Sequence, residues 1–132
     1  MAKYVFPAIF TQEEDGFTIN FPDVPNCFTE ADDITSAMEN AEDVLCMMLY
    51  DRERHNNDIP KASTIADIQQ HVTSDQFVTL IACDTIEYRK LHENRAIKKT
   101  LSIPSWLNEM AEDAGVNFSA ILQDALRKKL NI

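Results

Sequence analysis

Histidine and cysteine side chains are the groups in this 132-residue sequence best suited to metal binding or nucleophilic catalysis. The three histidines, His55, His71 and His92, lack the short spacing of zinc ligands, and no cysteine lies near them in the sequence. No Gly-x-Ser-x-Gly motif or cysteine-with-histidine signature of an activated nucleophile is present. The sequence therefore predicts no metal centre, no cofactor and no catalytic site of these types.

The three cysteines, Cys27, Cys46 and Cys83, contain no Cys-x-x-Cys pair, so free buried thiols in a reducing compartment are expected. The longest apolar run has seven residues, Val44 to Tyr50, whereas roughly 18 are needed to span a bilayer. Pro7 interrupts the apolar N-terminus, which also lacks a signal-peptide cleavage pattern. These features predict a cytoplasmic protein.

Glycine content and charge exclude further classes of protein. Gly16 and Gly115 are the only glycines, so neither a P-loop nor a Gly-x-Gly-x-x-Gly phosphate turn can be built. Of the net charge of -10, residues 1–94 carry -12, from 18 acidic and 6 basic residues, and residues 95–132 carry +2, from 4 and 6. The whole surface is thus unsuited to coating nucleic acid, although a local basic patch is allowed. Such asymmetry indicates two segments with different partners.

The first segment begins with a pattern typical of antiparallel strands. The strand expected over residues 4–11 contains Pro7, which favours a position at the edge of the sheet. An acidic turn at residues 13–16 leads to a half-buried strand over residues 17–21, and a proline-rich turn leads to a short strand over residues 27–30. The sequence predicts a three-stranded meander.

A helix and another strand should complete this sheet. Apolar residues at spacings of three and four predict a helix that starts at Asp32 or Asp33, crosses one face of the sheet and ends near Arg54. The uncharged run at residues 77–83 predicts a strand buried on both faces, paired in the middle of the sheet or against the first strand. Residues 85–94 are expected to form a short helix that leads into a linker.

Residues 3–50 resemble the opening of HicB-type antitoxins. The shared pattern is an aromatic-Pro-Ala strand, an acidic turn, a Phe-Pro-Asp-x-Pro turn before Cys27, and a helix with the Glu-Asn-Ala motif. Asn26 stands where that family has glycine, and asparagine tolerates positive φ well. The resemblance implies a degenerate RNase H-like fold without nuclease activity, which binds and inhibits a small basic HicA mRNA endoribonuclease.

Carboxylates of this segment could oppose the cations with which a ribonuclease holds RNA. The alternative is that each is a solvated surface group, so only their excess favours a basic partner. The candidate toxin-binding residues are Glu13, Glu14, Asp15, Asp23, Glu30 and Asp32, with Asp33 beside them.

Residues 96–132 have the pattern of a strand followed by two helices. The strand expected over residues 97–103 has no neighbour in its own segment, so another chain must pair with it. Pro104 suits the first turn of a helix, Gly115 can end that helix in the left-handed conformation, and Asn117 can cap the next one.

This order resembles a ribbon-helix-helix DNA-binding domain, in which two copies pair their strands and insert the ribbon into the major groove. By position, Lys98, Thr100 and Ser102 would read base edges, and Lys99 would reach a phosphate. The amides at Asn117 and Ser119 would receive another phosphate at the helix N-terminus. An ordinary exposed strand is the alternative for the first three residues, and helix-dipole stabilisation is the simpler explanation for the basic run at residues 127–129.

The sequence as a whole predicts an α+β protein with three parts: a HicB-like toxin-binding domain at residues 1–90, a linker at 91–95 and a ribbon-helix-helix domain at 96–132. Its expected function is that of an antitoxin that occludes its toxin, binds operator DNA as a homodimer, with further association left open, and performs no chemistry. A stand-alone repressor with a ligand-sensing or oligomerising N-terminal domain is the alternative. Nuclease activity is a minor hypothesis, because the first strand lacks the carboxylates that would hold Mg²⁺.

Overall fold

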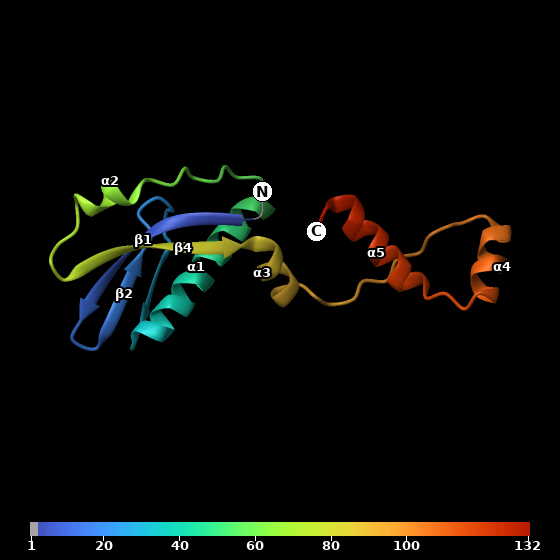
Figure 1. The fold of residues 1–132 in the computed structure, drawn as a ribbon, viewed down its shortest axis with the longest axis horizontal. Helices are drawn as coiled ribbons and strands as arrows, with labels where there is room; N and C mark the ends of the chain where they lie inside the picture. The colour runs from blue at the N-terminus through green and yellow to red at the C-terminus, as the bar shows by residue number, and fades with distance from the viewer. Residues whose placement is uncertain (1–2) are drawn as a thin grey trace. The chain divides into compact units, whose positions relative to one another are not determined.

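The computed structural model describes residues 3–132 of the chain (Figure 1). These residues form two compact units, which divide between Arg95 and Ala96. No helix within the described residues is long and apolar enough to cross a membrane.

The N-terminal unit contains a four-stranded sheet of order β3-β2-β1-β4, in which all neighbours are antiparallel. The strands are β1 (Lys3–Glu13), β2 (Gly16–Asn20), β3 (Phe28–Ala31) and β4 (Gln76–Asp84). The predicted three-stranded meander is therefore confirmed. A tight turn joins β1 to β2, because Glu13 pairs directly with Gly16. Asn26, in the turn before β3, has a φ of 59°, which explains why asparagine can replace glycine there.

The expected edge position of Pro7 is wrong for the strand as a whole, because β1 lies between β2 and β4. The pairing of β2 with β1 nevertheless stops at Ile9. The Gln12 amide donates to the Asp75 carbonyl at 3.0 Å, so the alternation of an antiparallel ladder turns the Pro7 nitrogen away from β4. The missing N–H of Pro7 thus falls where β1 has no second neighbour.

The prediction that the run at residues 77–83 is buried on both faces is also wrong. It forms β4, which pairs with the first strand, β1, and this is one of the two predicted positions. However, β4 lies at the edge of the sheet. Ile81 and Cys83 are buried, whereas the intervening Leu80 is 50% exposed. Only one face of β4 contributes to the core.

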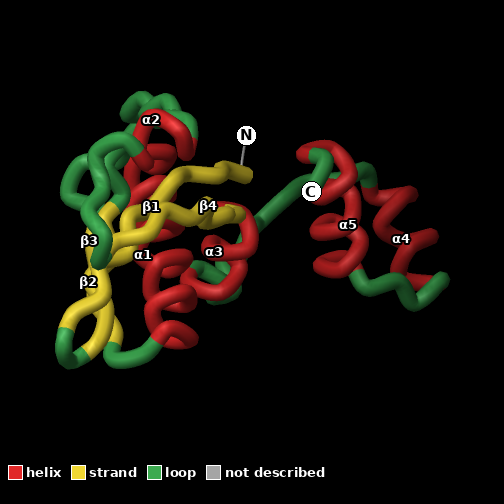
Figure 2. The backbone as a smooth tube through the Cα atoms, turned by 60° about the vertical axis from the view of Figure 1, so that its left-hand side comes forward, coloured by secondary structure: helices red, strands yellow, loops and turns green. Residues whose placement is uncertain are grey.

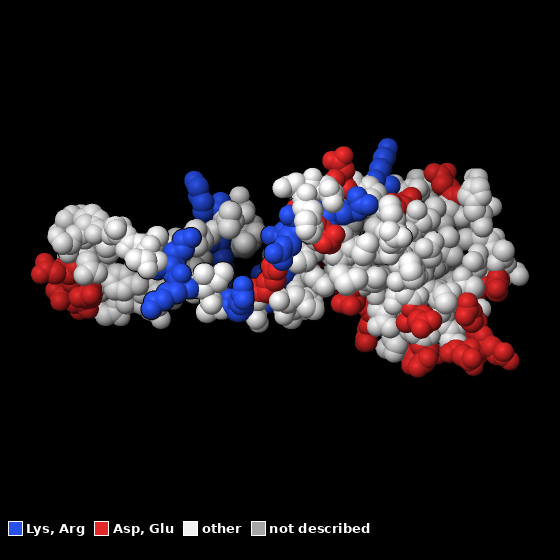
Figure 3. Space-filling model, turned by 180° about the vertical axis from the view of Figure 1, so that it is seen from behind, with Lys and Arg blue, Asp and Glu red and all other residues white. Residues whose placement is uncertain are grey.

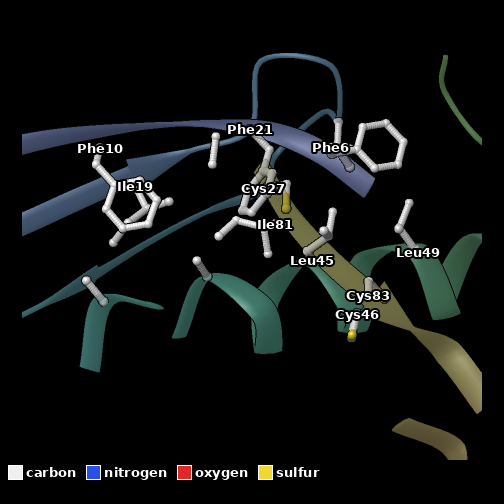
Figure 4. Close-up of a cluster of buried hydrophobic side chains, with 14 residues drawn as sticks. Phe6, Phe10, Ile19, Phe21, Cys27, Leu45, Cys46, Leu49, Ile81 and Cys83 are labelled. Atoms are coloured by element: carbon white, nitrogen blue, oxygen red, sulfur yellow. The ribbon is translucent and has the colours of Figure 1, made fainter. Parts of the chain in front are cut away.

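Helix α1 (Ile34–Arg54) begins and ends where the sequence predicts. Its N-cap is Asp33, whose Oδ1 accepts a 2.7 Å hydrogen bond from the Ser36 amide. The helix covers one face of the sheet and buries small and branched side chains against it (Figure 4). The core of the unit consists of Phe6, Ala8, Phe10, Ile19, Phe21, Val24, Cys27, Ala37, Ala41, Leu45, Cys46, Leu49, Ile81 and Cys83.

The other face of the sheet is partly covered by the chain between α1 and β4, which contains the short helix α2 (Ile65–Gln69) (Figure 2). Helix α3 (Thr85–His92) follows β4 directly and packs on α1. It confirms the expected short helix, and it extends two residues into the segment predicted as a linker.

The C-terminal unit contains α4 (Ser105–Asp113) and α5 (Phe118–Leu130). Gly115 has a φ of 68°, and the Asn117 side chain accepts a 3.0 Å hydrogen bond from the Ala120 amide, so the predicted turn and cap are both confirmed. The strand expected over residues 97–103 is absent from the single chain, where this segment is extended and unpaired. The reason is that a strand needs a partner, and residues 96–132 contain no second strand.

Candidate functional site

An acid-lined groove lies at one end of the N-terminal unit and encloses about 620 Å³. Three elements form it: the β1–β2 turn, the end of β3 and the first turns of α1. Its acidic lining residues are Glu13, Asp15, Glu30, Asp32, Asp33 and Glu39, and none of its lining residues is lysine or arginine. Figure 3 shows the red carboxylate side chains gathered at this end of the unit.

The folding of the turn and the helix start brings these acids together. Gly16 has a φ of 146°, and a Cβ at this position would lie 2.2 Å from the Ala31 carbonyl oxygen, so only glycine lets the hairpin approach the end of β3 this closely. The Asn40 side chain donates to the Glu30 carbonyl at 3.0 Å and ties α1 to β3. The groove is therefore a fixed feature of the fold.

The structure groups most of the predicted toxin-binding residues. Glu13, Asp15, Glu30 and Asp32 line one groove, and Glu14 lies exposed in the same turn. Glu39 also lines the groove, and sequence reasoning missed it as a member of this set. The available signal was its place on the polar face of α1, close to the helix start.

Asp23 does not belong to this group. Its two carboxylate oxygens accept hydrogen bonds from the Ser63 amide at 2.8 Å and the Ser63 hydroxyl at 2.6 Å. These bonds fasten the chain between α1 and β4 to the turn before β3. Both carboxylate oxygens of Asp23 are thus engaged by Ser63 within the N-terminal unit.

A polar cluster joins the start of β1 to α1 and α3. The Tyr4 hydroxyl donates to Glu53 at 2.7 Å, the Thr85 hydroxyl donates to the same carboxylate at 2.9 Å, and Arg89 lies 3.5 Å from its other oxygen. Burial, followed by the hydrogen bond to Glu53, raises the pKa of Tyr4 to about 12. The cluster anchors α3, after which the chain leaves the N-terminal unit.

The three cysteines are free and buried, as the sequence predicts. Burial raises the pKa of Cys27 to about 12, so it is a thiol at neutral pH. A hydrogen bond with Cys46, followed by burial, raises the pKa of Cys83 well above its usual value. Within residues 3–132, no three His, Cys, Asp or Glu side chains are grouped so that they could hold a metal ion.

The predicted DNA-contacting residues lie at two places in the C-terminal unit. The extended segment carries Lys98, Lys99, Thr100 and Ser102, all exposed. Asn117 and Ser119 lie at the start of α5 and are also exposed, with the Asn117 side chain engaged as the helix cap.

Residues 6–125 match the family described as the HicB-like antitoxin of bacterial toxin-antitoxin systems. The chain belongs to this family. The match covers most of both units, and it therefore extends well beyond the N-terminal stretch that carries the resemblance in the sequence.

Solved structures and a phage protein are similar to this family member. A chain from a toxin-antitoxin complex of Streptococcus pneumoniae is 25% identical, with a TM-score of 0.59 over 96% of this chain and 99% of that one. A chain of a HicA3 and HicB3 toxin-antitoxin complex is 15% identical, with a TM-score of 0.52 over 61% of this chain and 99% of that one, and shows the fold alone. An uncharacterised 14.9 kDa protein of Haemophilus phage HP1 is 26% identical over 78% of this chain and 75% of its own length.

Proposed function

We propose that this HicB-like antitoxin neutralises a small basic ribonuclease of the HicA type through its N-terminal unit. The observation that carries the proposal is the acid-lined groove, formed by the β1–β2 turn and the start of α1, in a chain that belongs to an antitoxin family. The similar chain from the toxin-antitoxin complex of Streptococcus pneumoniae supports a toxin as the partner.

The mechanism is occlusion without chemistry by this chain. A ribonuclease binds the RNA backbone with lysine and arginine side chains, and a groove lined by six carboxylates offers those cations an alternative partner. Opposite charge on the two proteins also accelerates their association. The bound antitoxin then occupies the surface that RNA needs.

The C-terminal unit is proposed to dimerise and bind operator DNA. Between Ala96 and Ile132 no side chain is buried, although this stretch contains many large apolar residues. Trp106 is 62% exposed and Met110 is 64% exposed. A second copy would cover this apolar surface and would supply the missing partner for residues 97–103.

In such a dimer, the paired segments form a ribbon that enters the major groove. Lys98 can donate to guanine, and Thr100 and Ser102 can donate to or accept from base edges. Lys99 contacts a phosphate, and the first amides of α5, next to Asn117 and Ser119, hold another. Operator binding of this kind would let the antitoxin repress its own operon.

Truncation after Asn94 tests the division of labour between the two units. The truncated chain should still neutralise the basic protein encoded next to it and should lose operator binding in a mobility-shift titration. As a point variant in the full chain, Lys98→Ala should cost about 1 to 3 kcal/mol of operator affinity while neutralisation is unchanged. Operator binding by the truncated chain, or a failure of the full chain to neutralise, would overturn the proposal.

A further inference from the structure

Strand β4 has an open edge whose free backbone groups can be identified. The Gln12 amide donates to the Asp75 carbonyl, so this position is a hydrogen-bonded pair of the β1–β4 ladder. Hydrogen-bonded and non-hydrogen-bonded pairs alternate along antiparallel strands. With Pro7 opposite Leu80, it follows that Val78, Leu80 and Ala82 direct their N–H and C=O groups away from β1.

Both ends of this edge are closed within the chain, but its middle is not. The Gln76 amide donates to the Thr73 carbonyl at 3.1 Å, and at the other end β4 runs directly into α3, with Asp84 as the N-cap of that helix. Among residues 3–132, nothing hydrogen-bonds to the outward groups of Val78, Leu80 and Ala82. Three consecutive outward positions are therefore ready to pair with another strand.

The composition of β4 does nothing to block such pairing. Proteins usually protect an exposed edge with lysine, proline, a bulge or a very short strand. The opposite edge, β3, is four residues long and carries Glu30. In contrast, β4 has nine residues and contains neither proline nor any charged residue before Asp84.

The surface beside the edge indicates the charge of the strand that would pair there. A groove of about 270 Å³ runs between β4 and α1, lined by Leu80, Ile81 and Ala82 of the strand and by the exposed Met38 of the helix. Glu39 and Glu42 of α1 line the same groove, so an occupant with basic side chains is favoured. A second copy of this chain, pairing through its own β4, would bring its Glu39 and Glu42 close to those of the first copy, and the like charges would repel.

We propose that β4 binds an extended segment of the basic toxin by strand addition along Val78, Leu80 and Ala82. This inference rests on the proposed function and says which backbone the toxin contacts. Glu39 lines both this groove and the acidic groove at the β1–β2 turn. The two grooves therefore share a carboxylate, and the toxin can follow the acidic surface along α1 to the sheet edge.

Amide hydrogen exchange of the full chain, measured residue by residue by NMR, tests the inference. The probe is a catalytically inactive form of the small basic protein encoded next to this chain. On binding, the outward amides of Val78, Leu80 and Ala82 should become protected by about tenfold or more. The intervening amides of Phe77, Thr79 and Ile81 already pair with β1 and serve as an internal control.

A pair of lysine variants provides an independent readout. Leu80→Lys places a charge on the open edge and should weaken toxin binding about tenfold or more, because edge lysines oppose strand addition and repel a basic partner. Val5→Lys is the matched control, because Val5 is equally 50% exposed and lies on the same sheet face, but on β1, away from the outward edge of β4. It should change the affinity by less than about threefold.

Each failure has a distinct meaning. Tight toxin binding without protection of the three outward amides overturns the inference and leaves the proposed function intact. Protection that appears in the free chain and grows with its concentration assigns the edge to a second copy, which also overturns the inference. The absence of any binding to the basic protein refutes the proposed function itself.

Discussion

Both glycines have positive φ, but only Gly16 is crowded by neighbouring atoms. Alanine substitutions at the two positions therefore distinguish steric crowding from backbone strain. We expect Gly16→Ala to reduce the free energy of unfolding by about 2 kcal/mol or more, because the new Cβ would lie 2.2 Å from the Ala31 carbonyl oxygen. Gly115→Ala meets no atom within 4 Å and should cost only about 1 kcal/mol, the price of a left-handed alanine. Urea unfolding of the two variants measures both values.

Because the two units can unfold separately, each variant needs a probe in its own unit. Trp106 fluorescence reports on the C-terminal unit, and the exchange of core amides such as that of Ile81 reports on the N-terminal unit. Equal losses for the two variants would contradict the crowding explanation for Gly16.

Tyr4 should make the stability of the N-terminal unit depend on pH in the alkaline range. Its pKa is about 12 in the folded chain and 10.0 as the reference for the unfolded chain, so the unfolded state loses its proton first. The stabilisation is therefore complete below pH 10 and is lost as pH rises towards 12. The urea midpoint should fall across this window, and Tyr4→Phe should reduce the fall.

Two other tyrosines limit the size of that reduction. The pKa of Tyr50 is raised mainly by a hydrogen bond with Glu93, and that of Tyr88 is raised mainly by burial. The decline should therefore shrink in the Tyr4→Phe chain without vanishing. An unchanged decline would mean that the contact between Tyr4 and Glu53 does not contribute to the alkaline dependence.

At the scale of the elements, the features predicted well are those encoded locally. The caps at Asp33 and Asn117 and the left-handed Gly115 follow from side chains within a few residues of the helix ends. The turn with Asn26 is local in the same sense. Boundaries of this kind could be predicted from the sequence because no distant partner decides them.

The features predicted poorly depend on distant partners. The apolar run of β4 does not reveal that one of its faces is left half exposed, since that depends on which segments of the chain pack on that face. The position of Pro7 depends on where β2 ends. The pairing of residues 97–103 with a second chain stays a prediction, since the single chain holds no strand there. At the candidate site, charge alone could nominate Asp23, and only the fold shows that Ser63 occupies it.

The apolar stripe of α5 predicts how the chain dimerises, and its exposed members are Phe118, Ile121, Leu126 and Leu130. Leu126 is 50% exposed in the single chain, and in the proposed dimer a charge there would be buried, so Leu126→Glu should cost about 2 kcal/mol or more of dimer stability. Gln123→Glu adds the same charge to the same helix outside the stripe and should leave the dimer intact. Sedimentation equilibrium of the full chain distinguishes the two, and equal dimerisation of both variants would contradict the stripe as the interface.

At the scale of the whole molecule, the acidic groove and the basic extended segment lie on different parts of the chain. The acidic residues of the groove belong to the first 94 residues, which carry -12, whereas the extended segment belongs to the part that carries +2. The proposed function, with cations bound by one unit and phosphates by the other, needs this separation, because a mixed surface would weaken both contacts.

The extended segment after α3 leaves a length of unpaired backbone between the two units, and strand pairing would shorten it. In the single chain, residues 93–104 form no helix or strand and connect the two units with backbone whose full span is about 3.3 to 3.6 Å per residue. In the proposed dimer, residues 97–103 become the ribbon, so only about four residues remain as a free tether. Pairing on the operator would then shorten the free linker to each toxin-binding unit. Residues 97–103 would thus determine both the DNA sequence that is bound and the distance over which a bound toxin can move.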